Sequence, residues 1–198
     1  VAESGLALHI GNKNYSSWSL RPWLLMRQLD IPFVEHLHPF EPDSDWTEFR
    51  ALCPSGKVPC LVAGDLVVWD SLAIVETLYE QYPTVWPASP AARAWARSAT
   101  AEMHSGFGTL RPVCTMSCGV RIRVDEIGPL LQRDLDRIAA LFADGLRRFG
   151  GPFLAGPSFT AVDAFYAPVA LRVQTYALPL PAPAREYVDR LLALPHVQ

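Results

Sequence analysis

Short apolar runs and helical patterns alternate along the first half of the chain. Leu6–Ile10 predicts a strand, a helix follows from about residue 17 to residue 30, and residues 33–38 alternate as a second strand should. A short helix at 45–52, a hairpin of strands at 59–62 and 66–69, and a helix at 72–82 complete this half. The order β-α-β-α-β-β-α predicts a small α/β domain with a mixed sheet.

The rest of the chain has a helical pattern throughout. Apolar side chains recur every three or four residues over 91–116 and again over 131–149, where Gly150 ends the second run. Thr160 and Asp163 form a capping box before the apolar run 164–173, and a last short helix is expected at 184–194. Proline-rich residues 83–90 are typical of a linker. We therefore expect an α+β protein with domains at 1–82 and 91–198, the second all-helical.

Composition and charge limit the classes of partner that we expect the protein to bind. At 198 residues, with 50% hydrophobic and 19% charged positions, the chain is typical of a globular protein with room for two modest cores. The net charge of −3 includes no basic cluster, which argues against a nucleic-acid partner. No apolar run reaches the roughly 20 residues that cross a bilayer, and residues 1–5 lack the features of a secretory signal. We expect a cytoplasmic protein without a membrane partner.

The cysteine pattern favours a reducing compartment and no metal. Cys53, Cys60, Cys114 and Cys118 include no CxxC pair and no zinc-like spacing. Such thiols usually pack in the interior as small hydrophobic groups.

Two short segments suggest a ligand site. Proline cannot donate to a sheet ladder, so Pro59 belongs at the first residue of a strand or on an edge, where Val58 could pair its backbone with a peptide-like ligand. Asp70 or Ser71 caps the next helix. In a functional interpretation, the helix N-terminus and the Ser71 hydroxyl hold a ligand carboxylate, and Asp70 meets an ammonium group. An edge proline and an ordinary N-cap are the simpler interpretations of each segment alone.

Tyr15, Ser16 and Ser17 lie at a strand-to-helix turn, where serines commonly cap the helix. A hydroxyl at a helix N-terminus would also stabilise a thiolate, because the helix dipole and a donated hydrogen bond both favour the anion. No Gly-x-Ser-x-Gly motif accompanies these serines. A serine hydrolase that uses Ser16 with a distant histidine such as His104 is therefore a weaker hypothesis.

These features in their order resemble the cytosolic glutathione transferase superfamily over almost the whole chain. The motifs that carry the resemblance are Val58-Pro59, Asp70-Ser71-x-Ala73-Ile74 and Thr160-x-x-Asp163. The segment at 14–23 looks like a bacterial serine-type branch related to the zeta and theta classes. The resemblance implies a thioredoxin-like first domain, a helical second domain, glutathione as co-substrate and a homodimer. Because the turn holds serines and no cysteine, disulfide reduction through a protein cysteine is disfavoured.

The resemblance also assigns roles to single residues. It implies that Pro59 is cis and that the Val58 backbone pairs with the cysteinyl part of glutathione. Asp70 and Ser71 would hold the γ-glutamyl end, and Lys57 would reach the glycyl carboxylate. We expect Ser16 to donate to the thiolate, with Ser17 and Tyr15 as alternatives.

The second substrate stays open at this point. The resemblance implies an electrophile pocket between the domains, with Met103, Phe107 and Arg111 as its expected lining and a small hydrophobic electrophile as its ligand. A zeta-like cis–trans isomerase of a small unsaturated acid is an alternative, and its cations would come from Arg21, His104, Arg111 or Arg121. A non-catalytic glutathione-binding or interaction protein is a third possibility. The natural electrophile, the dimer surface and a further C-terminal segment stay open.

Overall fold

The computed structural model describes residues 5–41, 46–124 and 126–198. Residues 1–4, which include most of the segment searched for a secretory signal, lie outside this range. Residues 42–45 also lie outside it, and residue 45 is the expected start of the short helix.

The sheet of the first half is mixed, as predicted. It contains β1 (Leu6–Ile10), β2 (Val34–Leu37), β3 (Cys60–Ala63) and β4 (Leu66–Val68) in the order β2-β1-β3-β4. β1 runs parallel to β2 and antiparallel to β3, and β3 and β4 form the expected hairpin. The parallel pair requires a crossover, which α1 (Ser17–Gln28) provides.

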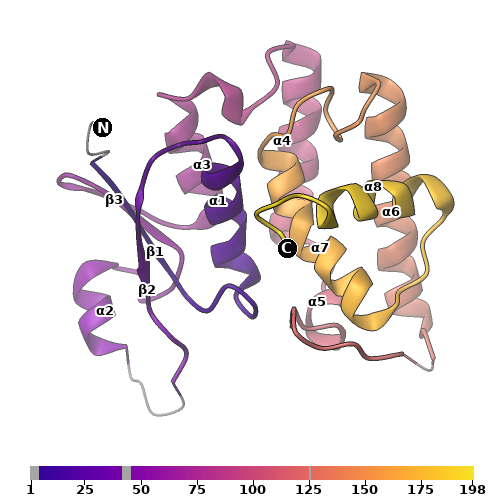
Figure 1. Ribbon diagram of the computed structural model, residues 1–198, viewed down its shortest axis with the longest axis horizontal. Helices are drawn as coiled ribbons and strands as arrows, with labels where there is room; N and C mark the ends of the chain where they lie inside the picture. Colours follow the sequence, from indigo (N-terminus) through magenta and orange to yellow (C-terminus); the bar gives the residue numbers. More distant parts are fainter. Residues whose placement is uncertain (1–4, 42–45, 125) are drawn as a thin grey trace.

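The two faces of this sheet carry different helices. Leu8, Ile10 and Leu61 are buried in the main core, on the side of α1 and of α3 (Ser71–Tyr79), which lie between the sheet and the helical half (Figure 1). Alternate side chains point to opposite faces. Cys60 therefore joins a separate small cluster on the other face, under the short helix α2 (Thr47–Leu52).

The second half is helical, and the two-domain α+β fold class is confirmed. The segment between the halves contains the 3₁₀ turn η1 (Pro83–Val85). The helices that follow it are α4 (Pro90–Ser105), α5 (Leu110–Val113), α6 (Pro129–Phe149), α7 (Ala161–Tyr176) and α8 (Ala182–Leu192). α7 is buried along nearly its whole length and packs against α1, α4 and α8 (Figure 1).

The expected continuous helix at 91–116 is wrong. α4 ends at Ser105, and a Cβ on Gly106 would lie 2.6 Å from the carbonyl oxygen of Glu102, so the chain approaches its own helix where only glycine fits. Phe107 then adopts a positive φ of 56°, and the short α5 begins at Leu110. The turn between the helices is held by Asp134 of α6, which accepts hydrogen bonds from the amides of Thr109 and Leu110, both at 3.0 Å.

The start of α7 is held by a fully buried carboxylate. Asp163 accepts hydrogen bonds from the amides of Thr160 and Leu154 (3.0 Å each) and from the Tyr187 hydroxyl (2.8 Å). Thr160 and Asp163 form a capping box. Burial raises the pKa of Asp163 to about 6, although the four groups that donate to it oppose this rise. The carboxylate thus joins α7, α8 and the loop before α7.

We predict that Asp163→Ala destabilises the protein by about 3 kcal/mol, because it removes the acceptor of four buried donors. The measurement is the free energy of unfolding in urea. Asp136→Ala is the matched control, since Asp136 on α6 is exposed and accepts a hydrogen bond from Gln132. Equal losses in the two variants would contradict the role given to Asp163.

Candidate functional site

The first turn of α1 is fixed by a small hydrogen-bond network. Ser16 is the N-cap, and its Oγ accepts from the Ser19 amide (3.2 Å) and donates to the Ser19 hydroxyl (2.8 Å). Ser19 also accepts from the amide of Gly11, just after β1, at 3.0 Å. Ser16 is therefore a helix cap, and its hydroxyl lies at the wall of a pocket.

That pocket, of about 600 Å³, is the first of three that meet at Trp18. Ser16, Trp18, Arg50, Lys57 and Val58 contribute to its lining. β3 pairs with β1 only from Cys60 onward, so Val58 lies outside the ladder. Within the described residues, its N–H and C=O form no backbone hydrogen bond. The Val58–Pro59 peptide bond is cis.

The second pocket, of about 410 Å³, extends from Val58 to the start of α3 and includes Lys57, Pro59, Trp69 and Asp70 in its lining. Asp70 caps α3, with Oδ1 accepting from the amides of Leu72 (2.9 Å) and Ala73 (3.5 Å). The next residue, Ser71, is fully buried, and its hydroxyl has no hydrogen-bond partner among the described residues. A helix N-terminus beside an unused hydroxyl suits a carboxylate.

His104 of α4, in the helical half, contacts Asp70, which lines this second pocket. Its Nε2 lies 3.1 Å from Oδ2 of Asp70, and its ring meets Trp18 edge-on at 5.2 Å between centroids. Burial lowers the pKa of His104, an effect that the Asp70 carboxylate opposes. The imidazole is therefore mostly neutral at pH 7, and its contact with Asp70 is a hydrogen bond more than an ion pair.

The third pocket, also of about 410 Å³, lies between the start of α1 and the helical half. Its lining includes Tyr15, Ser17, Trp18, Arg111 and Arg172. The three candidate hydroxyls are thus divided: Ser16 faces the first pocket, whereas Tyr15 and Ser17 face the third.

The residues expected to form the electrophile pocket are only partly together. Arg111 lines the third pocket. Met103 and Phe107 are buried in the core, Phe107 against Tyr166, and they do not line any of the three pockets. Arg121 is exposed and donates to the side chain of Gln174.

Sequence reasoning missed Trp18, which lines all three pockets. The available signal was an aromatic residue in the first turn of a helix, next to serines that were already candidates. Arg172 was also missed, because it sits inside the apolar run of α7 and resembles no motif.

The structure does not place Ser16 and His104 in the arrangement that a serine hydrolase requires. Ser16 hydrogen-bonds Ser19, and His104 meets Asp70; within the part of the chain that the structure describes, no hydrogen bond joins Ser16 to His104. The described residues also contain no group of three or more His, Cys, Asp or Glu side chains that could hold a metal ion. None of the described helices is long and apolar enough to cross a membrane.

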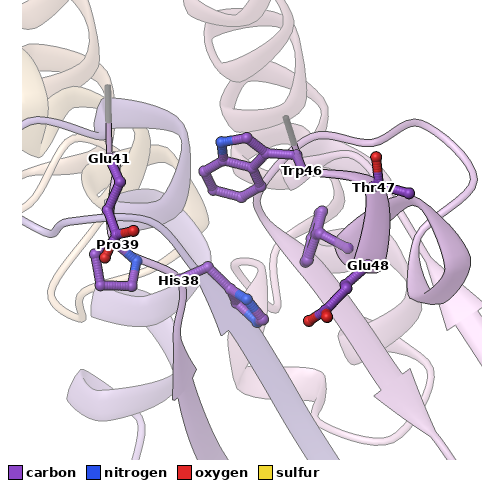
Figure 2. Close-up of a pocket in the computed structure, with 7 residues that line it drawn as sticks. His38, Pro39, Glu41, Trp46, Thr47 and Glu48 are labelled. Carbon is purple, nitrogen blue, oxygen red and sulfur yellow. The ribbon is translucent and has the colours of Figure 1, made fainter. Parts of the chain in front are cut away.

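A separate pocket of about 310 Å³ lies at α2, between residues 38–41 and 46–49 (Figure 2). Beside it is a histidine cluster: Nδ1 of His9 is 2.9 Å from Nε2 of His38, and the His9 ring stacks on His36 at 4.6 Å. His38 also packs edge-on against Phe49 of α2, at 4.8 Å. Burial, with the two neighbouring histidines, lowers the pKa of His9 to about 4. His9 is therefore neutral at pH 7.

A thioredoxin-like domain followed by an all-helical domain, with ligand-sized pockets where the two meet, is the architecture of the cytosolic glutathione transferases. The sequence matches the family models described as the glutathione S-transferase N-terminal domain, over residues 15–81, and the glutathione S-transferase C-terminal domain, over residues 123–196. The chain belongs to the glutathione S-transferase family.

The individual relatives share low sequence identity with this chain. A zeta-class glutathione S-transferase of Euphorbia esula is 28% identical over 166 residues, which span 82% of this chain and 73% of the relative. A theta-class enzyme of Xanthomonas axonopodis pv. citri, solved with glutathione bound, superposes with a TM-score of 0.69 at 22% identity, covering 98% of this chain and 96% of the other. A bacterial zeta-class maleyl pyruvate isomerase gives 0.72 at 22% identity, covering 96% and 94%. At such identities the two structures establish the fold alone.

We predict that acidification destabilises the protein through His9. A histidine with a folded pKa near 4 and an unfolded pKa near 6.5 binds its proton more readily in the unfolded chain. Its contribution to stability is complete above about pH 6.5 and is lost as the pH falls toward 4. Between pH 7 and pH 5, the unfolding free energy should drop by about 2 kcal/mol from this residue.

The pH dependence of urea unfolding provides the measurement. His9→Gln should flatten it over this range, whereas His196→Gln, at an exposed position near the end of the chain, should not. Parallel curves for the wild type and the His9 variant would disprove the assignment.

Proposed function

We propose that this protein is a serine-type glutathione transferase that binds glutathione, stabilises its thiolate and adds it to an electrophilic carbon. One observation carries the proposal. Ser16 shares a pocket with Val58, whose backbone groups form no backbone hydrogen bond among the described residues, and Val58 in turn shares a second pocket with Asp70 at the start of α3. Family membership makes glutathione the ligand to test first.

In this proposal the tripeptide lies along the two connected pockets. Its cysteinyl unit pairs with the backbone of Val58 as an added strand. Its γ-glutamyl carboxylate takes the unused Ser71 hydroxyl and the N-terminal amides of α3, and its ammonium group meets Asp70. The ammonium group would share Oδ2 of Asp70 with His104. Lys57, exposed and at the wall of both pockets, would meet the glycyl carboxylate.

Ser16 can serve the thiolate if its bond with Ser19 reverses. At present the Ser16 hydroxyl donates to Ser19 at 2.8 Å. The Ser19 hydroxyl is equally able to donate to Ser16, because a hydroxyl rotates freely and acts as both donor and acceptor. The Ser16 proton would then point to the sulfur. Ser19, held by the Gly11 amide, acts in this scheme as the residue that positions Ser16.

Catalysis would combine a lowered thiol pKa with proximity. The thiol loses its proton to water, and the thiolate forms a carbon–sulfur bond with an electrophile held in the third pocket. We further propose residues 1–82 as the glutathione-binding domain, 83–90 as the linker and 91–198 as the domain that completes the electrophile site. A homodimer in the cytoplasm is the assembly and location that we propose.

A second candidate is glutathione-dependent cis–trans isomerisation. It is favoured by Arg111 and Arg172 at the third pocket, together with the zeta-class protein among the relatives. Isomerisation and conjugation share the thiolate and differ in whether the adduct collapses back to free glutathione. A non-catalytic glutathione-binding protein would lack the lowered thiol pKa.

We predict that Ser16→Ala returns the thiol pKa of bound glutathione toward about 8.5 and lowers kcat/KM about 10- to 100-fold, since a hydrogen bond to a charged group is lost. Ultraviolet titration of the thiolate on saturated enzyme measures the first effect. Ser89→Ala is the matched control, because Ser89 also caps a helix, α4, away from the pockets. A bound thiol with an unshifted pKa in the wild type would eliminate the catalytic proposal. A shift that responds only to Ser17→Ala would reassign the donor.

We predict that Ser71→Ala weakens glutathione binding about tenfold without destabilising the protein. The Ser71 hydroxyl is buried and has no partner among the described residues, so its removal costs the free protein no hydrogen bond. Calorimetric titration with glutathione and urea unfolding measure the two effects. Unchanged affinity, or a loss of stability that matches the loss of affinity, would contradict the placement of the γ-glutamyl end.

A further inference from the structure

Trp18 lies between the pocket of Ser16 and the third pocket. Ser16 lines the first pocket, whereas the electrophile of the proposed reaction is held in the third. The first and second pockets share Lys57 and Val58 as well as Trp18. Among the described lining residues, Trp18 is the only one that the third pocket shares with either of them. A thiolate held by Ser16 and an electrophile in the third pocket would therefore lie on different sides of this residue.

A buried arginine that the proposed mechanism does not use lies against the indole. Arg21 follows Trp18 by three residues on α1, and its guanidinium carbon is 4.2 Å from the centroid of the Trp18 ring. It also meets the ring of Phe165, at 4.9 Å. The two aromatic faces offset part of the cost of burying this charge, which the Asp70 carboxylate also favours.

The aromatic contacts of Arg21 matter because its polar contacts are few. The residue is 1% exposed, and it forms no ion pair with another described residue. Its Nε and Nη1 are buried without a hydrogen-bond partner in the described part of the chain. The cation is therefore stabilised in part by the Trp18 face, and the same contact holds the indole in place.

Two further side chains hold the ring from the helical half. The guanidinium carbon of Arg111, on α5, lies 4.8 Å from the centroid of the Trp18 ring, and the His104 ring meets the indole edge-on at 5.2 Å. Each of these side chains is itself fixed. Arg111 donates to the carbonyl oxygens of Met103 and His104, and the His104 side chain contacts Asp70 at 3.1 Å. Contacts from α1, α4 and α5 thus make the indole a rigid wall.

A rigid wall at this point restricts the shape of the electrophile. Carbon and sulfur must approach within about 3–3.5 Å before a bond can form. The third pocket offers the body of the electrophile about 410 Å³, but the reacting carbon has to pass the edge of the indole to reach a sulfur at Ser16. A primary carbon or a planar alkene carbon fits such a passage, whereas a carbon that branches would contact the ring.

We infer that Trp18 determines the specificity of the electrophile site: it admits electrophiles whose reacting carbon is unbranched and excludes those that branch at that carbon. Arg21, His104 and Arg111 act by holding the indole in the position that makes this selection. The inference rests on the proposed function, because it takes the sulfur of bound glutathione to lie at Ser16.

The test compares two glutathione conjugates that carry the same number of carbons on the sulfur. S-hexylglutathione has a linear chain, whereas S-cyclohexylglutathione branches at the carbon next to the sulfur. Both are titrated by calorimetry. We expect the wild type to bind the linear conjugate at least about tenfold more tightly, because forcing extra atoms against a fixed side chain is costly. Equal affinities, or tighter binding of the branched conjugate, would overturn the inference.

Variants locate the selection. Trp18→Ala removes the wall and should abolish most of the preference, mainly through tighter binding of the branched conjugate. Trp18→Leu keeps an apolar side chain in the helix turn and should lower the preference in part, which provides a test even if the alanine variant fails to fold. Trp23→Ala is the matched control, because Trp23 lies on the same helix and does not line any of the three pockets. A preference at the wild-type level in every Trp18 variant that folds would overturn the assignment.

Glutathione itself, titrated in the same way, separates this inference from the proposed function. Failure to bind glutathione would reject the proposed function and the inference with it. Binding of glutathione without any preference between the conjugates would reject the inference alone. A preference that depends on Trp18, together with an unshifted thiol pKa, would reject the catalytic proposal and keep Trp18 as the selective wall.

Discussion

The hydrogen bonds among Gly11, Ser16 and Ser19 determine where the rest of the site lies. They join the end of β1 to the first turn of α1 and so fix the helix start relative to the sheet. α1 packs on the sheet and also against α7, the most buried helix of the second domain. A displacement of this turn would therefore alter the contact between the domains as well as the position of Ser16. The three pockets meet at Trp18 because it is the one side chain of this turn that lines all three.

Periodicity predicted the strands and most helices well, because alternation and the three-to-four spacing reflect which face of an element is buried. It failed at residues 106–109. Phe107 and Leu110 keep the helical spacing and are both buried, so the pattern continues although the helix stops. The break depends on a close approach between Gly106 and the carbonyl of Glu102, a contact that no hydrophobic pattern encodes.

In the candidate site, too, local sequence rules predicted some features, whereas others depend on tertiary packing. The positions of Ser16, Val58, Asp70 and Ser71 follow from local rules for caps and edge prolines. The structure places Ser16, Val58 and Asp70 at the walls of two connected pockets, with Ser71 buried next to Asp70. The contact of His104 with Asp70, and the contact of Arg111 with the Trp18 ring, join residues far apart in the chain. Such contacts depend on how α1, α4, α5 and α7 pack, which the order of elements alone does not specify.

The net charge of the chain is a poor guide to the electrostatic potential in the third pocket, which Arg111 and Arg172 line. The chain as a whole carries a net charge of −3. The electrostatic potential inside a buried site nevertheless depends mainly on the unpaired charges nearby, because the low dielectric of the protein interior screens those charges only weakly. Arg111 and Arg172 line the third pocket, and the partners of their described hydrogen bonds are neutral carbonyl groups, so their charge is least favourable in the free protein. An anion held at the same helix turn would offset part of that cost.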